Sequence, residues 1–435
     1  MTNLNELSAV AAARRIADGA VTSEDLVAAC LARIEAREDA VGAWQYLDPD
    51  AALAEARARD AQATGGAPRG PLHGLPVAVK DLIDTADMPT TYGSPIYADH
   101  RPVADAACVV ALRAAGAVIL GKTVTTEFAV FKPGKTRNPH DLARTPGGSS
   151  SGSAAAVVDH MVALALGTQT AGSVIRPAAF CGAVGYKPSY GAIDMAGVKD
   201  AAPTLDTLGV FARSVADAAL LAQTMARPGT ALAAVDPRAL DGDAPRVGLC
   251  RTPQWDRAEA AQRSALEDLC ERLAAAGADI DEAPTPPDFD GLADAQDDIM
   301  WAGLARSLAP ERRDHAELLS DPLREKLDAG AALPEERVAA AEALAVSCRG
   351  QLDTLFGDRD VIVAPPAPGE APDAATTGDP LFNRMWNLLR APALTLPVAK
   401  GPAGLPLGAQ ILARAGNETG LLRAAHWIER ACGPI

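Results

Sequence analysis

Two short turns rich in glycine and serine lie close together in the 435-residue chain. The first is GGSSSGS at 147–153 and the second is TAGS at 170–173. Between them, AAAVVDHM reads as a helix and VALALGT reads as an apolar strand. Glycine permits backbone angles that other residues avoid, and serine supplies hydroxyl groups. This segment therefore constrains both the local fold and the chemistry that the chain can perform.

The hydrophobic pattern of the chain favours an α/β fold. A helix followed by an apolar strand at 107–123, and a strand–helix–strand pattern at 246–282, are typical of parallel or mixed sheets. Apolar residues at helical spacing predict a pair of helices over 4–38, with a cap at 22–25. Further strands are expected at LPVAV, VIVAPP and PALTLPVA, and further helices at 50–63, 214–225 and 418–432.

Residues 283–350 differ from the rest in composition. They are rich in Pro, Asp, Glu and Ala and carry helical stretches with few strand signals. We expect a helical excursion on the substrate side of the molecule, not an independent domain. A chain of this length can bury one large core. We therefore expect a single domain over 1–435 with its catalytic core at 60–225.

Composition excludes several classes of function. The chain has 40 Lys and Arg against 56 Asp and Glu, a formal charge of −16, which disfavours nucleic-acid binding. Its 7 cysteines are dispersed, with no C-x-x-C and no His/Cys cluster, which favours free thiols in the cytoplasm over disulfides or a metal site. No apolar run is long enough to span a membrane. We expect no metal and no organic cofactor.

Two familiar motifs fail to explain the first turn. Gly147 and Gly152 have the spacing of a phosphate-binding loop, but Ser153 stands where that loop needs lysine. GSSSG at 148–152 matches the nucleophile elbow of histidine-dependent hydrolases, but the preceding PHDLARTP reads as a loop and not as the required strand. None of the 6 histidines has an obvious signature.

A lysine offers a different base. Lys80 follows the apolar segment LPVAV, so burial is expected. A serine hydroxyl needs a base that removes its proton during attack. Burial can lower a lysine pKa from about 10.4 towards roughly 7–8, so that a neutral amine is available. A second hydroxyl can accept one proton while it donates another, and can therefore bridge the amine and the nucleophile.

With these residues the chain resembles the amidase signature family, and within it the small stand-alone bacterial amidases of the malonamidase type. The resemblance covers roughly 5–430 and rests on the following segments: PVAVKDLID, TPGGSSSGSAAA, GTQTAGSVIRPAA, GYKPSYG, LDTLGVFARSVADA, APALTLPV and GLPLGAQIL. It implies an α/β/α sandwich with a central mixed sheet and an N-terminal helical pair.

The resemblance also implies roles for individual residues. Ser173 would be the nucleophile, Ser149 the relay serine on a cis peptide bond, and Lys80 the base. The oxyanion hole would be formed at the turn, by the following residues: Thr170, Ala171, Gly172 and Ser173. A backbone turn of this kind can expose several amides to the developing charge.

Three further residues stand at this segment. Ser150 is expected in an auxiliary role. Arg176 has two interpretations: it braces the turn through an ion pair with Asp206 or another acid, which we favour, or it binds a substrate carboxylate. Gln169 occupies a position where many members of the family carry Asp, and Ala171 replaces a common Gly. These two differences weaken the analogy to the glutaminase subunit of tRNA-dependent amidotransferases.

The expected activity is hydrolysis of a carbon–nitrogen bond in a small linear amide through an acyl-enzyme. A carbamate, as in urethanases, or an ester fits the same chemistry. The alternative is the A-type, glutaminase subunit of a tRNA-dependent amidotransferase. Substrate choice is expected to depend on 88–140, 283–350 and 382–390, in which Trp301, Met385 and Trp386 could line a pocket or belong to the core. A small-molecule substrate is expected, with a homodimer left open.

Overall fold

The computed structural model describes residues 3–65, 70–130 and 132–433, and its strands form one 11-stranded sheet. The order is β1-β3-β2-β4-β6-β5-β10-β11-β9-β7-β8. The strands are β1 (Trp44–Leu47), β2 (Pro76–Lys80), β3 (Val118–Thr123), β4 (Leu164–Gln169), β5 (Val184–Lys187), β6 (Thr207–Ala212), β7 (Arg246–Leu249), β8 (Asp279–Glu282), β9 (Val361–Ala364), β10 (Ala393–Lys400) and β11 (Pro406–Leu412). Parallel β3-β2-β4 and antiparallel β4-β6-β5 make the sheet mixed, as predicted.

Helices pack on both faces of this sheet. They are α1 (Ala9–Ala17), α2 (Ser23–Val41), α3 (Pro49–Thr64), α4 (Ala107–Ala114), α5 (Ser151–Val158), α6 (Ile175–Cys181), α7 (Val215–Thr224), α8 (Ala260–Ala275), α9 (Leu292–Ser307), α10 (Ala309–Asp314), α11 (Asp321–Ala331), α12 (Glu335–Arg349), α13 (Leu352–Phe356), α14 (Leu381–Leu388) and α15 (Glu418–Cys432). Successive side chains of a strand point to opposite faces. Accordingly, Val77 and Val79 join the core beneath α4, α7, α8 and α15, and Ala78 joins the core beneath α2, α5 and α6. The predicted α/β/α sandwich is confirmed.

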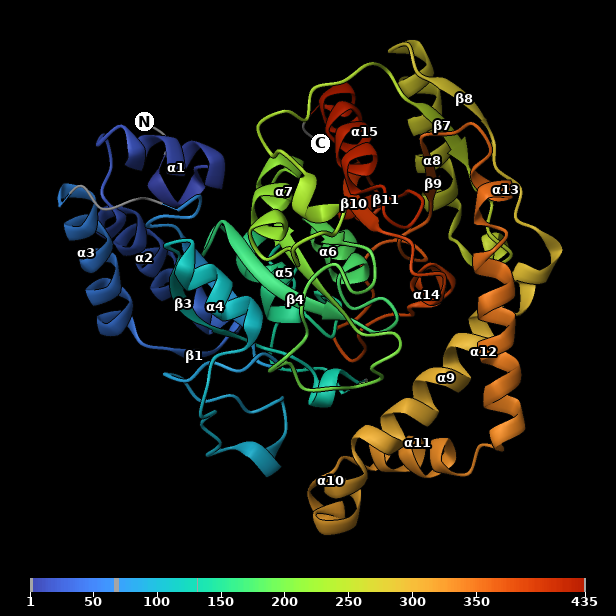
Figure 1. Cartoon of the computed structure of the whole chain (residues 1–435), viewed down its shortest axis with the longest axis horizontal. Coiled ribbons are helices and arrows are strands. Elements are labelled where there is room, and N and C mark those ends of the chain that lie inside the picture. Colours follow the sequence, from blue (N-terminus) through green and yellow to red (C-terminus); the bar gives the residue numbers. More distant parts are fainter. Residues whose placement is uncertain (1–2, 66–69, 131, 434–435) are drawn as a thin grey trace.

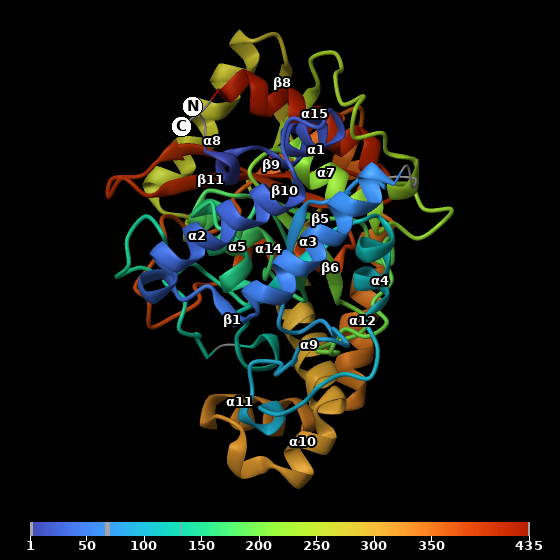
Figure 2. The same ribbon diagram turned by 90° about the vertical axis from the view of Figure 1, so that its left-hand side faces the viewer.

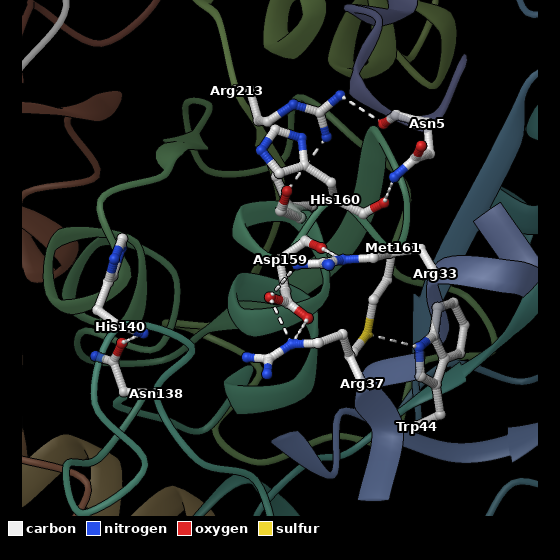
Figure 3. Close-up of polar contacts among 11 residues, drawn as sticks. Asn5, Arg33, Arg37, Trp44, Asn138, His140, Asp159, His160, Met161 and Arg213 are labelled. Carbon is white, nitrogen blue, oxygen red and sulfur yellow. Dashed lines mark hydrogen bonds and ion pairs between the residues drawn. The ribbon is translucent and has the colours of Figure 1, made fainter. Parts of the chain in front are cut away.

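The N-terminal helical pair begins with two caps and is fastened to the core. Ser8 caps α1, and Thr22 forms a capping box with Asp25 at the start of α2, where the sequence predicted a cap. Figure 3 shows Arg33 and Arg37 of α2 pointing to the buried carboxylate of Asp159 at the end of α5. Helix α2 thus holds the C-terminal end of α5, the helix that follows the first Gly/Ser turn.

Residues 283–350 are helical, as predicted, and contain α9–α12. In Figures 1 and 2 these helices form an arm that extends away from the sheet, with α10 and α11 at its far end. A separate apolar cluster joins α9 and α14 to Ala171 of the second Gly/Ser turn. The arm is therefore packed against the candidate site at its base. Among the described residues, no helix has the length and apolar character needed to cross a membrane.

Candidate active site

Lys80 lies at the end of β2 and contacts both neighbouring chain segments of the candidate site. Its Nζ donates hydrogen bonds to Ser149 Oγ at 2.7 Å and to Thr168 Oγ1 at 2.8 Å. Thr168 belongs to β4, which pairs with β2. The Lys80 side chain is 0% exposed and Ser149 is 2% exposed. The structure therefore brings together Lys80 and Ser149 and adds Thr168, which the sequence did not single out.

The first Gly/Ser turn places Ser149 directly before α5. The Gly148–Ser149 peptide bond is cis, as the resemblance implied. Thr126 N donates to Ser149 O at 3.3 Å, which fixes the backbone beyond that bond. Ser150 Oγ lies 3.3 Å from both the carbonyl oxygen and the amide nitrogen of Thr168. Ser150 thus holds the turn against β4, beside the hydroxyl that binds Lys80.

The second turn connects β4 to α6 and carries Ser173. Ser173 is 8% exposed, against 2% for Ser149. Within the described residues, the two serine hydroxyls share no hydrogen bond. The turns are joined instead by Arg176, whose Nη2 donates to Gly148 O at 2.6 Å. Ser173 therefore stands on a turn whose position is tied to the peptide preceding Ser149.

The amide groups of the second turn have no hydrogen-bond acceptor among the described residues. The hydrogen bonds of the described residues use none of the N–H groups at 171–173. By contrast, the N–H groups of Val174 and Ile175 both donate to Gln169 Oε1, at 2.9 and 3.0 Å. Gln169 therefore caps α6 and leaves three consecutive donors free. Such a row of fixed amides is what stabilisation of an oxyanion requires.

Burial has opposite effects on the two charged groups nearest the turn. It lowers the pKa of the Lys80 ammonium to about 7, and the carboxylate of Asp206 opposes that shift. Burial also raises the pKa of Asp206 to about 6. Asp206 accepts a hydrogen bond from Thr170 Oγ1 at 2.6 Å and from the amides of Ala201 and Ala202 at 2.9 Å. Near neutral pH, a substantial fraction of the Lys80 amine is therefore neutral and able to accept a proton.

A pH profile tests the state of this amine. If neutral Lys80 is the base, the second-order rate constant should fall about tenfold per pH unit below an apparent pKa of about 7. Asp206→Asn removes the charge that raises the pKa of Lys80, so it should move this acid limb to lower pH. Loss of the limb in that variant would show that Asp206, and not Lys80, is the titrating group.

The structure corrects the partner expected for Arg176. Arg176 forms no ion pair with Asp206 among the described residues, since Asp206 accepts from Thr170 instead. The Arg176 guanidinium donates to the carbonyl oxygens of Gly148 and Gly378, the latter at 2.9 Å. The side chain is 5% exposed, and burial lowers its pKa to about 10. These contacts support a bracing role, not binding of a substrate carboxylate.

Loss of Arg176 should therefore affect stability. Arg176→Met leaves the buried carbonyl of Gly148 and the part-buried carbonyl of Gly378 without these donors, so the free energy of unfolding should fall by about 2–5 kcal/mol. Urea denaturation measures this change, and the same substitution at the exposed Arg238 should have little effect. The ratio of turnover for carboxylated and neutral amides should remain unchanged. A selective loss for carboxylated amides would instead establish Arg176 as a substrate clamp.

Several histidines of the described residues have hydrogen-bond partners away from the two serines. Figure 3 shows His140 and His160 in polar surroundings of their own, and His140 Nε2 lies 2.9 Å from Cys181 O. His100 contacts the hydroxyl of Tyr92. Between described residues, no hydrogen bond or ion pair joins a histidine to Ser149 or Ser173. The segment before Gly148 is a loop, so the nucleophile-elbow interpretation lacks both its strand and its base.

A model of the family described as Amidase matches residues 25–422. This chain belongs to the amidase signature family. Among curated proteins, it is 37% identical to the A-type subunit of the glutamyl-tRNA(Gln) amidotransferase of Anaeromyxobacter sp. (strain K), over 97% of this chain and 95% of that protein.

Solved structures extend the comparison to hydrolases. The native peptide amidase from Stenotrophomonas maltophilia has a TM-score of 0.86 and 30% identity, over 98% of this chain and 97% of that chain. The 6-aminohexanoate cyclic dimer hydrolase complexed with substrate has a TM-score of 0.87 and 26% identity, over 100% of this chain and 98% of that chain. Both the fold and the family are therefore those that the sequence motifs indicated.

The remaining aromatic and sulfur-containing candidates lie in the core beside the turn. Trp301, Met385 and Trp386 are 8%, 2% and 1% exposed and belong to the apolar cluster that contains Ala171. Trp386 Nε1 is buried without a hydrogen-bond partner among the described residues. Two polar side chains, Gln296 of α9 and Asn387 of α14, also contact the second turn. No short sequence motif indicated these contacts.

Proposed function

We propose that this protein hydrolyses an amide carbon–nitrogen bond through a Ser173 acyl-enzyme, with Lys80 and Ser149 as the proton relay. The observation that carries the proposal is the 2.7 Å hydrogen bond between Lys80 Nζ and Ser149 Oγ. The open amides at 171–173 supply the complementary feature, a site for the developing negative charge.

The proposed reaction begins with proton transfer along two hydroxyls. As Ser173 Oγ attacks the substrate carbonyl carbon, its proton passes to Ser149 Oγ, and the Ser149 proton passes to neutral Lys80 Nζ. The tetrahedral intermediate places its oxyanion against the turn at 170–173. Its collapse breaks the carbon–nitrogen bond, and the proton returns through Ser149 to the leaving nitrogen. The product of this half-reaction is an ester of Ser173.

Water completes the cycle by the same route. It loses a proton to Ser149 and Lys80 as its oxygen attacks the acyl carbon, and collapse of the second intermediate returns a proton to Ser173 Oγ. Thr168 Oγ1 remains a fixed acceptor for Lys80 Nζ in both halves, which keeps the amine aimed at Ser149. The relay therefore acts as base in acylation and as acid when each leaving group departs.

A second function is favoured by the curated relatives. The 37%-identical protein belongs to a glutamyl-tRNA(Gln) amidotransferase, and the match covers nearly all of both chains. In that role, Ser173 would release ammonia from glutamine for a partner-dependent transfer. The chemistry at Ser173 is the same in both cases, so the geometry of the site alone favours neither function. The peptide amidase and cyclic dimer hydrolase support the stand-alone hydrolase.

Turnover by the isolated chain separates the two functions. The purified protein is incubated without ATP or tRNA with aryl, aliphatic and carboxylated amides, phenyl carbamates, p-nitrophenyl esters and glutamine. We expect release of amine and acid from at least one non-glutamine amide, abolished in Ser173→Ala. Activity on glutamine alone, stimulated by partner proteins, would favour the amidotransferase role. Absence of turnover on every compound would contradict the proposed hydrolase.

The thiols of the chain bear on its cellular setting. All 7 cysteines are unpaired, and the thiols at the core, such as Cys181, have a pKa raised by burial. Such thiols suit a reducing compartment, so we place the protein in the cytoplasm. Its substrate would be a small molecule, and the buried Arg176, engaged by backbone carbonyls, would not be the group that binds it.

A further inference from the structure

Two amide side chains from outside the Gly/Ser motifs meet at one carbonyl of the second turn. Gln296 Nε2, from α9 of the arm, donates to Thr170 O at 3.0 Å. Asn387 Nδ2, from α14, donates to the same oxygen at 2.7 Å and to Leu205 O at 3.0 Å. Gln296 is 0% exposed and Asn387 is 3% exposed. A backbone oxygen bound by two buried amides has little rotational freedom.

The direction of this carbonyl determines the direction of an amide. A trans peptide unit is planar, with its C=O and N–H pointing to opposite sides. Because Thr170 O is held towards α9 and α14, the N–H of Ala171 points away from those helices. That N–H is one of the three that have no acceptor among the described residues. We propose that Gln296 and Asn387 are positioning residues that aim the Ala171 N–H at the oxyanion.

Other contacts also restrict the conformation of the second turn. Asp206 holds the Thr170 side chain through Oγ1 at 2.6 Å. Arg176 N donates to Gly172 O at 3.0 Å, so the peptide that carries the Ser173 N–H is also fixed. Close packing leaves no room for a side chain at Gly172, where a Cβ would lie 2.3 Å from Asn383 Oδ1. In the peptide units 170–171 and 172–173, the carbonyl oxygen therefore accepts a hydrogen bond, whereas the N–H group has no acceptor among the described residues.

The helical arm gains a role from these contacts. Gln296 lies on α9, and α9 packs against α14, which carries Asn387. The arm is also tied to the catalytic region by Ser320 N, which donates to the buried carboxylate of Glu127 at 3.1 Å. The arm thus completes the oxyanion site in addition to bordering it. The inference rests on the proposed function, because an oxyanion forms only if Ser173 attacks a carbonyl.

A trifluoromethyl ketone is the probe, because attack by a serine converts it into a hemiketal oxyanion. With phenyl trifluoromethyl ketone, Gln296→Met and Asn387→Leu should each raise the inhibition constant about tenfold or more, since removal of one oxyanion donor costs about a hundred- to a thousandfold and displacement of a donor should cost less. For a hydrolysed p-nitrophenyl ester, kcat should fall by a similar factor while KM changes little. Gln296→Met leaves the bond from Asn387 to Leu205 O intact, so it remains informative if Asn387→Leu unfolds.

Gln262 provides a matched control. It is 0% exposed, its Nε2 donates to the backbone oxygen of Gly408 at 2.9 Å, and its Oε1, like that of Gln296, has no partner among the described residues. Gln262→Met should lower the melting temperature much as Gln296→Met does, with an unchanged inhibition constant. Wild-type inhibition constants in a folded Gln296→Met variant would overturn the inference.

Failure of the proposed function gives a different result. Before the variants are compared, the wild-type protein is treated with a fluorophosphonate, and the adduct is located by mass spectrometry. An adduct on Ser173 together with unaltered inhibition in Gln296→Met rejects only the positioning role. Absence of an adduct on Ser173 rejects the acyl-enzyme itself and, with it, the inference.

Discussion

Ser173→Ala should abolish turnover, with kcat reduced by about 10⁴-fold or more, because loss of a serine nucleophile removes the whole covalent route. The substitution deletes one oxygen atom from a turn whose backbone is held by Gln169, by the amide of Arg176 and by Asn387. The fold and the substrate affinity should therefore be retained. Steady-state hydrolysis of an amide and of a p-nitrophenyl ester measures the loss, and thermal unfolding checks the fold.

A neighbouring serine is the control for this prediction. Ser151 is also buried in the first Gly/Ser turn, but its Oγ donates to Val124 O at 3.3 Å, away from Lys80. Ser151→Ala should keep turnover within a few-fold of the wild type. Equal losses in the two variants would mean that serine removal disturbs the fold, and retained turnover in Ser173→Ala would exclude Ser173 as the nucleophile.

Lys80→Met should have the second largest effect, a loss of acylation of at least about a hundredfold, which is typical when a general base is removed. Methionine keeps an unbranched side chain of similar length, so it fills the space between β2 and the first turn. Without the amine, the protons of Ser149 and Ser173 have no acceptor. The remaining rate should lose its acid limb near pH 7, because the group with the lowered pKa is gone. Single-turnover kinetics across pH measure both changes.

Lys187 makes this test specific. It is equally buried, burial lowers its pKa to about 7, and among the described residues its Nζ donates only to the carbonyl oxygens of Pro188 and Ala391. Lys187→Met should reduce stability and leave the acid limb in place. If the acid limb persisted in Lys80→Met and disappeared in Lys187→Met, the titrating group would be Lys187, which is not part of the proposed relay.

The parts of the fold with regular patterns were predictable from the sequence. The capped pair α1–α2, the buried strand β2 and the closing helix α15 all follow from apolar spacing or cap residues, which are local signals. β1 and α14 were not predicted. β1 has only four residues and pairs antiparallel with β3 at the sheet edge. α14 begins beside Pro380 and has no side-chain cap, so its boundaries depend on packing against α9.

The candidate site shows the same division. Lys80 and the two Gly/Ser turns are short, ordered motifs, and the structure places Lys80 against Ser149. Thr168 and Asp206 lie within quoted motifs, yet their contacts with Lys80 and Thr170 depend on how strands pair across the sheet. Gln296 lies more than a hundred residues from the carbonyl it binds. A lone glutamine in a helix gives no sequence signal for such a contact.

The most direct test of the proposed relay is the position of covalent labelling by a serine-reactive fluorophosphonate. The purified wild-type protein is labelled at pH 8, digested, and the modified peptide sequenced by mass spectrometry. We expect one adduct, on Ser173, with much slower labelling in Lys80→Met. An adduct on Ser149 or Ser150, or labelling of Ser173 at an undiminished rate without Lys80, would contradict the relay.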